Sequence, residues 1–152
     1  MGQFGIGQAV RRKEDVRFIT GTGRFTDDVR RPGMAHAVFI RSPHAHARLG
    51  AIGAAAARSA PGVLAVFTGA DVSAAGLGRI RCVVPLQNRD GSPYDNPGRP
   101  LLAQGKVRHV GEAVAMVVAE SLVAAKDAAE LVAVSYEPVP AVVEPAAATR
   151  EG

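Results

Sequence analysis

The sequence has 152 residues, of which 47% are hydrophobic, and this suits one domain with a core of its own. Tryptophan is absent and aromatic residues make up only 5%, so Ala, Val, Leu and Ile must build that core. The net charge of +4 arises in residues 1–110, which hold 16 Lys and Arg against seven Asp and Glu, since residues 111–152 hold two against seven.

This composition excludes several classes of function and location. The arginines are scattered, without a basic helix or aromatic side chains on which bases could stack, so we expect no nucleic-acid partner. A basic surface that docks against another subunit fits better. The single cysteine, Cys82, excludes an intrachain disulfide and indicates a reducing compartment. The chain shows neither a signal pattern nor an apolar run of membrane-spanning length, so we expect a cytoplasmic protein without membrane insertion.

Residues 1–33 are predicted to form an N-terminal arm with turns. Residues 15–19 fit one short helical turn. Gly21 and Gly23 follow, but a dinucleotide-binding loop would follow a strand, open a helix and contain a third glycine. We therefore interpret both glycines as turn residues with positive φ.

Residues 34–52 predict two extended segments separated by a break. The first, MAHAVFI, is an apolar strand over residues 34–40, which needs cover on both sides. Proline cannot donate a ladder hydrogen bond, so the strand should end at Ser42-Pro43. Residues 44–52 then alternate at first, as a strand with one solvated face does.

Three of the four histidines lie here, which raises the hypothesis of a metal site. His44 and His46 share a face if the chain is extended. However, zinc and iron sites need further protein ligands, and no cysteine or carboxylate lies between His36 and Arg58. A solvated strand face is the preferred interpretation, and a histidine-based metal enzyme remains an alternative.

Residues 53–105 predict a helix, a strand and a long loop. The alanine-rich segment 53–60 favours a helix that ends at Pro61-Gly62, and VLAVFT at residues 63–68 reads as a buried strand. Residues 69–72 begin a turn or brief helix. Residues 73–105 form a loop of a length that is usually functional or partner-facing, with a short pairing at residues 80–84. We expect Cys82 to be a packed thiol, because no activating group is placed beside it.

The last third of the chain predicts alternating strands and one helix. Strands are expected at residues 106–110, 113–119 and 132–136, with a last short strand at 141–143; the second, AVAMVVA, should be buried. Glu112 resembles a general base, but a lone carboxylate is more often structural, so we do not nominate it.

A helix over residues 122–131 should be capped by Ser121. Its inner face is expected to carry Leu122, Ala125, Ala129 and Val132, and its outer face an ion pair between Lys126 and Glu130. Together, these elements predict an α/β (α+β type) domain with one curved mixed sheet and two short helices. The residues alone show neither a catalytic pair nor a phosphate loop.

Five segments, taken in order, resemble the N-terminal part of the molybdopterin-binding large subunit of molybdenum hydroxylases. This is the family of xanthine dehydrogenase, aldehyde oxidase and aerobic carbon monoxide dehydrogenase. The segments are RFITGTGRFTDDV at residues 17–29, PGM to FIRSPHAHAR at 32–48, PGV to VFTGAD at 61–71, VRHVGE at 107–112, and DAAELV to YEPVPAVV at 127–143.

The resemblance implies an α/β-hammerhead domain over residues 34–145, including the loop 73–105, with a tail or truncation point at 146–152. It implies an oxidoreductase whose holoenzyme carries a molybdenum–pterin cofactor, [2Fe–2S] clusters and FAD. The expected partners are the remaining molybdopterin-binding part of the large subunit and the iron–sulfur and FAD subunits or domains.

In this family the cofactor-binding segments and the base glutamate lie further along the chain. The resemblance therefore assigns no catalytic, cofactor-binding or metal residue to residues 1–152, and places substrate specificity elsewhere. We expect a structural and docking role without activity by this chain alone. The chain would then be a fragment, a truncated reading frame or a separately encoded hammerhead. The alternative is a free-standing binding or assembly module without redox activity.

Overall fold

The computed structural model describes residues 11–81, 83–84, 86–95 and 97–150, and the chain divides into two units, Met1–Met34 and Ala35–Gly152. The first unit contains the predicted helical turn, α1 (Asp15–Ile19), and a 3₁₀ turn, η1 (Thr26–Asp28). Gly21 has the expected positive φ, +72°. Gly23 does not: it is needed because a Cβ there would collide with the ring of Phe18, which stacks on Phe25 at 5.2 Å.

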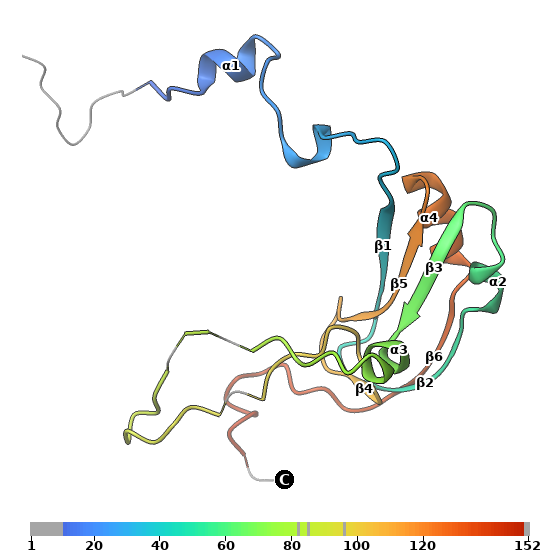
Figure 1. The fold of residues 1–152 in the computed structure, drawn as a ribbon. Helices are drawn as coiled ribbons and strands as arrows, with labels where there is room; N and C mark the ends of the chain where they lie inside the picture. Colours follow the sequence, from blue (N-terminus) through green and yellow to red (C-terminus); the bar gives the residue numbers. More distant parts are fainter. Residues whose placement is uncertain (1–10, 82, 85, 96, 151–152) are drawn as a thin grey trace, which may run out of the picture. The chain divides into compact units, whose positions relative to one another are not determined.

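The second unit contains two three-stranded sheets (Figure 1). The first sheet has the order β1-β5-β3 and the second the order β4-β2-β6, and every pairing is antiparallel. Their bounds are β1 (His36–Arg41), β2 (Ala47–Gly53), β3 (Val63–Thr68), β4 (Lys106–Val107), β5 (Ala113–Ala119) and β6 (Ala133–Pro138). The predicted fold class is therefore confirmed, whereas the single mixed sheet is replaced by two antiparallel ones. The chain crosses from one sheet to the other at the predicted break, Ser42-Pro43.

Three short helices accompany the sheets: α2 (Ala55–Arg58), α3 (Gly69–Ala74) and α4 (Leu122–Glu130). The predicted cap of α4 is confirmed, since Ser121 Oγ accepts the N–H of Ala124 at 3.1 Å. Its predicted inner face is partly wrong: Ala125 and Ala128 are buried, whereas Leu122 is 45% exposed. In the described part of the chain no ion pair joins Lys126 to Glu130.

The core consists of small aliphatic side chains, as the composition predicted. One cluster joins α2 and α4 to the first sheet, and a second lies at the start of β2 and at β4. The first contains Ala54, Ala57, Val66, Ala115, Val117, Ala128 and Val132; the second contains Ala47, Ala103, Val107 and Val114. Ile40 and Val134 pack against both clusters, so the two sheets share one apolar interior.

Several predicted strands are shorter in the structure. β4 ends at Val107, and residues 141–143 form no strand because Val142 and Val143 lie in solvent, 66% and 78% exposed. Among the described residues of the segment 80–84, the expected pairing is one antiparallel bridge between Ile80 and Arg99. Cys82 lies outside the described residues. Within the described ranges, no helix has the length and apolar character that crossing a membrane requires.

Candidate docking surface

The two faces of the first sheet differ sharply in cover. The inner face packs against α2 and α4. On the opposite side, which we call the outer face, the antiparallel register aligns Phe39, Met116 and Phe67 in one row across three strands. The neighbouring row is again wholly apolar and consists of Ala37, Val118 and Ala65.

The outer face is apolar but lacks cover from the second unit. Phe39 and Phe67 are 44% and 41% exposed, so the expectation that β1 is covered on both sides is wrong for this unit. The charged side chain of Arg41 borders the row, since its guanidinium carbon lies 5.6 Å from the centre of the Phe39 ring. Contiguous apolar surface of this kind marks a site of interaction.

A corner of backbone hydrogen bonds connects the crossing between the sheets to the turn before β5. The N–H of Ser42 donates to Glu112 O at 2.9 Å, and the N–H of Gly111 donates to Ser42 O at 2.8 Å. The hydroxyl oxygen of Ser42, which is 2% exposed, accepts the N–H of His44 at 3.0 Å. These bonds fix the position at which the chain leaves β1.

Glu112 is buried within this corner, 6% exposed, and its carboxylate stabilises the turn before β5. Its Oε2 accepts the N–H of Arg108 at 2.6 Å, and its Oε1 lies 4.0 Å from Arg108 Nη1. Both carboxylate oxygens therefore face Arg108, and Glu112 has a structural part to play here.

Replacing the buried Glu112 by alanine is expected to destabilise the chain by about 2 kcal/mol, because the N–H of Arg108 would lose its acceptor. Glu112→Gln keeps an acceptor oxygen and should cost less. Urea unfolding followed by circular dichroism measures both, and the exposed Glu120→Ala is the matched control. A loss from Glu112→Ala no larger than that from Glu120→Ala would contradict this structural role.

His44 and His46, the two histidines considered for a metal site, contact different neighbours. The ring of His44 lies 4.9 Å from that of Tyr136, and His46 Nδ1 lies 2.9 Å from Pro140 O. Burial raises the pKa of the Tyr136 phenol, and a hydrogen bond with the Ser42 hydroxyl opposes part of that rise. Among the residues that the structure describes, no three His, Cys, Asp or Glu gather closely enough to hold a metal ion.

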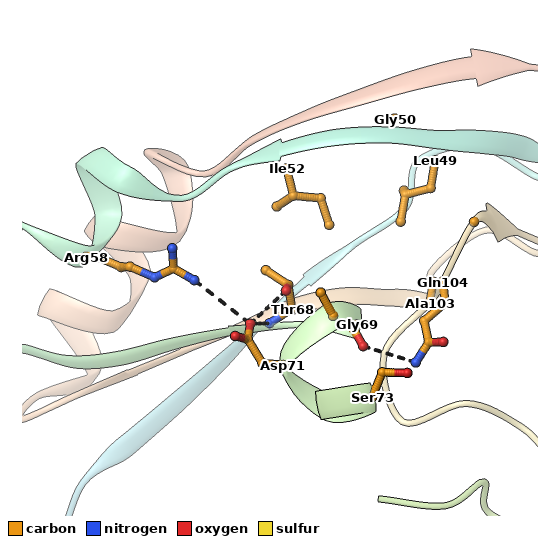
Figure 2. A pocket seen from close by; sticks show the side chains of 12 residues that line it. Leu49, Gly50, Ile52, Arg58, Thr68, Gly69, Asp71, Ser73, Ala103 and Gln104 are labelled. Atoms are coloured by element: carbon orange, nitrogen blue, oxygen red, sulfur yellow. Dashed lines mark hydrogen bonds and ion pairs between the residues drawn. The ribbon is translucent and has the colours of Figure 1, made fainter. Parts of the chain in front are cut away.

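A separate groove of about 560 Å³ lies between β2 and α3 (Figure 2). Several of its polar side chains bond to other groups in the groove wall. The carboxylate of Asp71 accepts the N–H and the hydroxyl of Thr68, both at 2.7 Å, and lies 3.9 Å from Arg58 Nη2. At the other end, Gln104 Nε2 donates to Gly69 O at 3.0 Å. These hydrogen bonds join residues of the chain to one another, so the groove helps to position α3.

The comparison with known proteins decides the family. The family model described as "Aldehyde oxidase and xanthine dehydrogenase, a/b hammerhead domain" matches residues 20–140. The chain belongs to this family. The hammerhead domain is similar to the carbon monoxide dehydrogenase large chain of Afipia carboxidovorans, with 40% identity over 93% of this chain and 16% of that protein. It is also 39% identical to the xanthine dehydrogenase molybdenum-binding subunit of Escherichia coli O157:H7, over 92% of this chain and 18% of that subunit.

Solved structures agree with this assignment. Quinoline 2-oxidoreductase from Pseudomonas putida 86 matches the hammerhead domain with a TM-score of 0.80 and 44% identity, over 94% of this chain and 17% of that chain. The Cu,Mo-CO dehydrogenase matches with a TM-score of 0.75 and 41% identity, over 95% and 17%. The hammerhead domain thus spans about a sixth of the length of the proteins that it resembles.

Thr68 provides a pH-dependent contribution to the stability of the hammerhead domain. Its hydroxyl, then its N–H, and more weakly the charge of Arg58, lower the pKa of Asp71 below the ordinary 3.8. Because the folded pKa is depressed, this contribution is present above the unfolded pKa and is lost as the pH falls through the folded one.

Asp71→Asn should therefore flatten the fall in stability between about pH 5 and about pH 2. The effect should be modest, because the side chain of Asp71 is 43% exposed to solvent. Urea unfolding at a series of pH values measures it, and Asp95→Asn in the exposed loop is the control. Parallel pH profiles for Asp71→Asn and the unsubstituted chain would contradict the assignment.

Proposed function

We propose that this chain is the hammerhead portion of a molybdenum hydroxylase large subunit and acts there as a structural and docking part. In this proposal the molybdenum–pterin cofactor is held by the remaining part of the large subunit. [2Fe–2S] clusters and FAD are carried by neighbouring domains or subunits, and the whole enzyme is cytoplasmic. Catalytic and cofactor-binding residues lie outside residues 1–152. The observation that carries the docking role is the uncovered outer face of the first sheet.

The physical argument starts from the exposed rings of Phe39 and Phe67. Covering the parts of these rings that remain in water would contribute about 1 kcal/mol for each, with more from the aliphatic row beside them. The face carries no carboxylate on the described residues of β1, β3 or β5, so an apolar partner meets no desolvation penalty from an acidic group. This favours permanent cover by a protein surface.

The occupant that we propose is the remaining part of the large subunit. The proteins that this chain resembles extend well beyond the matched region, which is about a sixth of their length. A domain of this size with an apolar sheet face is most simply covered by the protein that contains it. The alternative, a free-standing binding module, lacks a comparable supporting observation.

A domain exchange tests this proposal. Residues of this chain would replace the corresponding part of the Afipia carboxidovorans carbon monoxide dehydrogenase large chain, and the purified chimera would be assayed for molybdenum content and for oxidation of CO. We expect an assembled, molybdenum-containing chimera. A chimera that folds but leaves the rest of the large chain without molybdenum would overturn the proposal. A stable monomer of this chain alone that binds no hydrophobic dye would favour the free-standing module.

A further inference from the structure

A second surface, on the second sheet, differs from the outer face in its chemistry. Two adjoining hollows of about 560 and 530 Å³ lie beside β2 and β4. They share His46, Lys106 and Arg108, and Arg48 and His109 extend the set at either end. We call this continuous depression the basic groove.

Two like charges face each other in the basic groove. Arg48 on β2 is the direct antiparallel partner of Lys106 on β4. Like charges directly opposite each other destabilise a strand pair. Arg108 follows two residues after Lys106 and adds a third cation at the end of β4. The arrangement costs stability in the chain by itself, and an anionic partner would reverse that cost.

The nearby carboxylates neutralise the basic groove only in part. Glu137 lies 3.8 Å from Arg48, but the two side chains are 75% and 72% exposed, and such a pair contributes little. Glu112 is buried, accepts the backbone N–H of Arg108 and lies 4.0 Å from Arg108 Nη1, so it offsets part of the charge of Arg108 alone. Among the described residues that line the two hollows, none is acidic.

The other wall of the basic groove is apolar. It is formed by residues 139–143, and Val142 and Val143 are 66% and 78% exposed. This wall is attached to the start of β2, because the N–H of Val139 donates to His46 O at 3.1 Å and His46 Nδ1 lies 2.9 Å from Pro140 O. A row of cations thus faces a row of exposed aliphatic side chains.

We propose that the basic groove binds an extended acidic polypeptide segment of a neighbouring subunit, in which apolar side chains alternate with carboxylates. This inference rests on the proposed function and adds a second docking site to it. Carboxylates would lie along Arg48, Lys106 and Arg108, and the alternate side chains would cover Val142 and Val143. A separate subunit is the source that we favour, because complementary charges steer chains that meet by diffusion.

The direct test uses the 152-residue chain and a fluorescein-labelled short peptide of alternating Glu and Val, with fluorescence anisotropy as the readout. The double variant Arg48→Gln/Lys106→Gln should weaken binding roughly tenfold near 0.15 M salt. Lys106→Arg keeps the charge and should bind as the unsubstituted chain does. The control Arg24→Gln/Arg89→Gln removes the same net charge from exposed positions that are not among the lining residues of the two hollows, and should change binding little.

Three outcomes would overturn the proposal. Equal losses of peptide affinity in the double variant and in the control would show that binding depends only on the net charge of the chain. Tight binding of a peptide of alternating Gln and Val would show that carboxylates are not recognised. Displacement of the peptide by inorganic pyrophosphate at far lower concentration would indicate a phosphate-bearing ligand instead.

A second measurement separates this inference from the proposed function. In the chimeric large chain, Arg48→Gln/Lys106→Gln should leave the molybdenum content unchanged but weaken the association with the neighbouring subunits and make it less sensitive to salt. Loss of molybdenum in the unsubstituted chimera would contradict the proposed function. If the Arg48→Gln/Lys106→Gln chimera assembled with the same salt sensitivity as the unsubstituted chimera, the peptide-binding role of the basic groove would be contradicted, and the proposed function would stand.

Discussion

Serine at both Phe39 and Phe67 is expected to prevent the chimeric large chain from assembling while leaving the hammerhead domain folded. Both rings are more than 40% exposed, so their loss removes little of the domain's own core. In the assembled large chain both rings would be covered, and truncating two central aromatic side chains should cost about 3 kcal/mol or more of association free energy. The measurements are molybdenum per large chain and sedimentation of the chimera.

The matched control for this variant removes exposed apolar side chains from another surface. Leu122 and Val123 on α4 are 45% and 68% exposed, so Leu122→Ser/Val123→Ser changes a similar type of surface without touching the outer face. The control should assemble normally. The double phenylalanine variant of the isolated chain should also bind less hydrophobic dye. Normal assembly of the Phe39→Ser/Phe67→Ser chimera would rule out docking through the outer face.

Alanine at Gly69 is expected to lower the free energy of unfolding by about 2–3 kcal/mol, the range for overpacking a tightly filled site. A Cβ at Gly69 would collide with the carbonyl oxygen of Ala103 and approach Gln104 Cγ to 2.8 Å. The carbonyl belongs to the backbone, so the segment before β4 must move. The same substitution should weaken the hydrogen bond from Gln104 to Gly69 O, which is drawn in Figure 2.

Gly78→Ala provides the control for this second prediction. Gly78 lies outside the left-handed region, and a Cβ there would meet nothing within 4 Å. That variant should be neutral or slightly stabilising, because alanine restricts the unfolded chain. Urea unfolding compares the two variants. If Gly69→Ala were as stable as Gly78→Ala, the close approach between α3 and residue 103 would not require glycine at position 69, and the prediction would be wrong.

Local signals in the sequence were sufficient to predict the bounds of several strands and the start of one helix. β3 and β5 coincide with the predicted apolar runs, because each run is bounded by residues that end a strand, and α4 begins at its predicted cap. The separation into two sheets could not be read in this way. It depends on which distant strands pair, for example Ala47 with Val107, and pairing between remote segments leaves no local pattern.

The docking surfaces were even less visible in the sequence. Phe39, Phe67 and Met116 are far apart along the chain, and only the register of three strands places them in one row. The sequence of β3 is a continuous apolar run, and such a run does not show which of the strand's two sides is covered. The basic half of the sequence did suggest a docking surface. It could not show that Arg48 and Lys106 face each other, because that contact also depends on strand register.

The hydrogen bonds that join Ser42 to Gly111 and Glu112 connect the end of β1 to the beginning of β5, immediately before the chain enters the second sheet. Because these two backbone hydrogen bonds join both crossings between the sheets, and because the sheets share one apolar interior, rotation of one sheet against the other would disrupt both. The hammerhead domain is thereby a bracket of fixed geometry. A partner bound on one sheet therefore sets the orientation of whatever is held by the other, so the two interfaces are aligned before any assembly takes place.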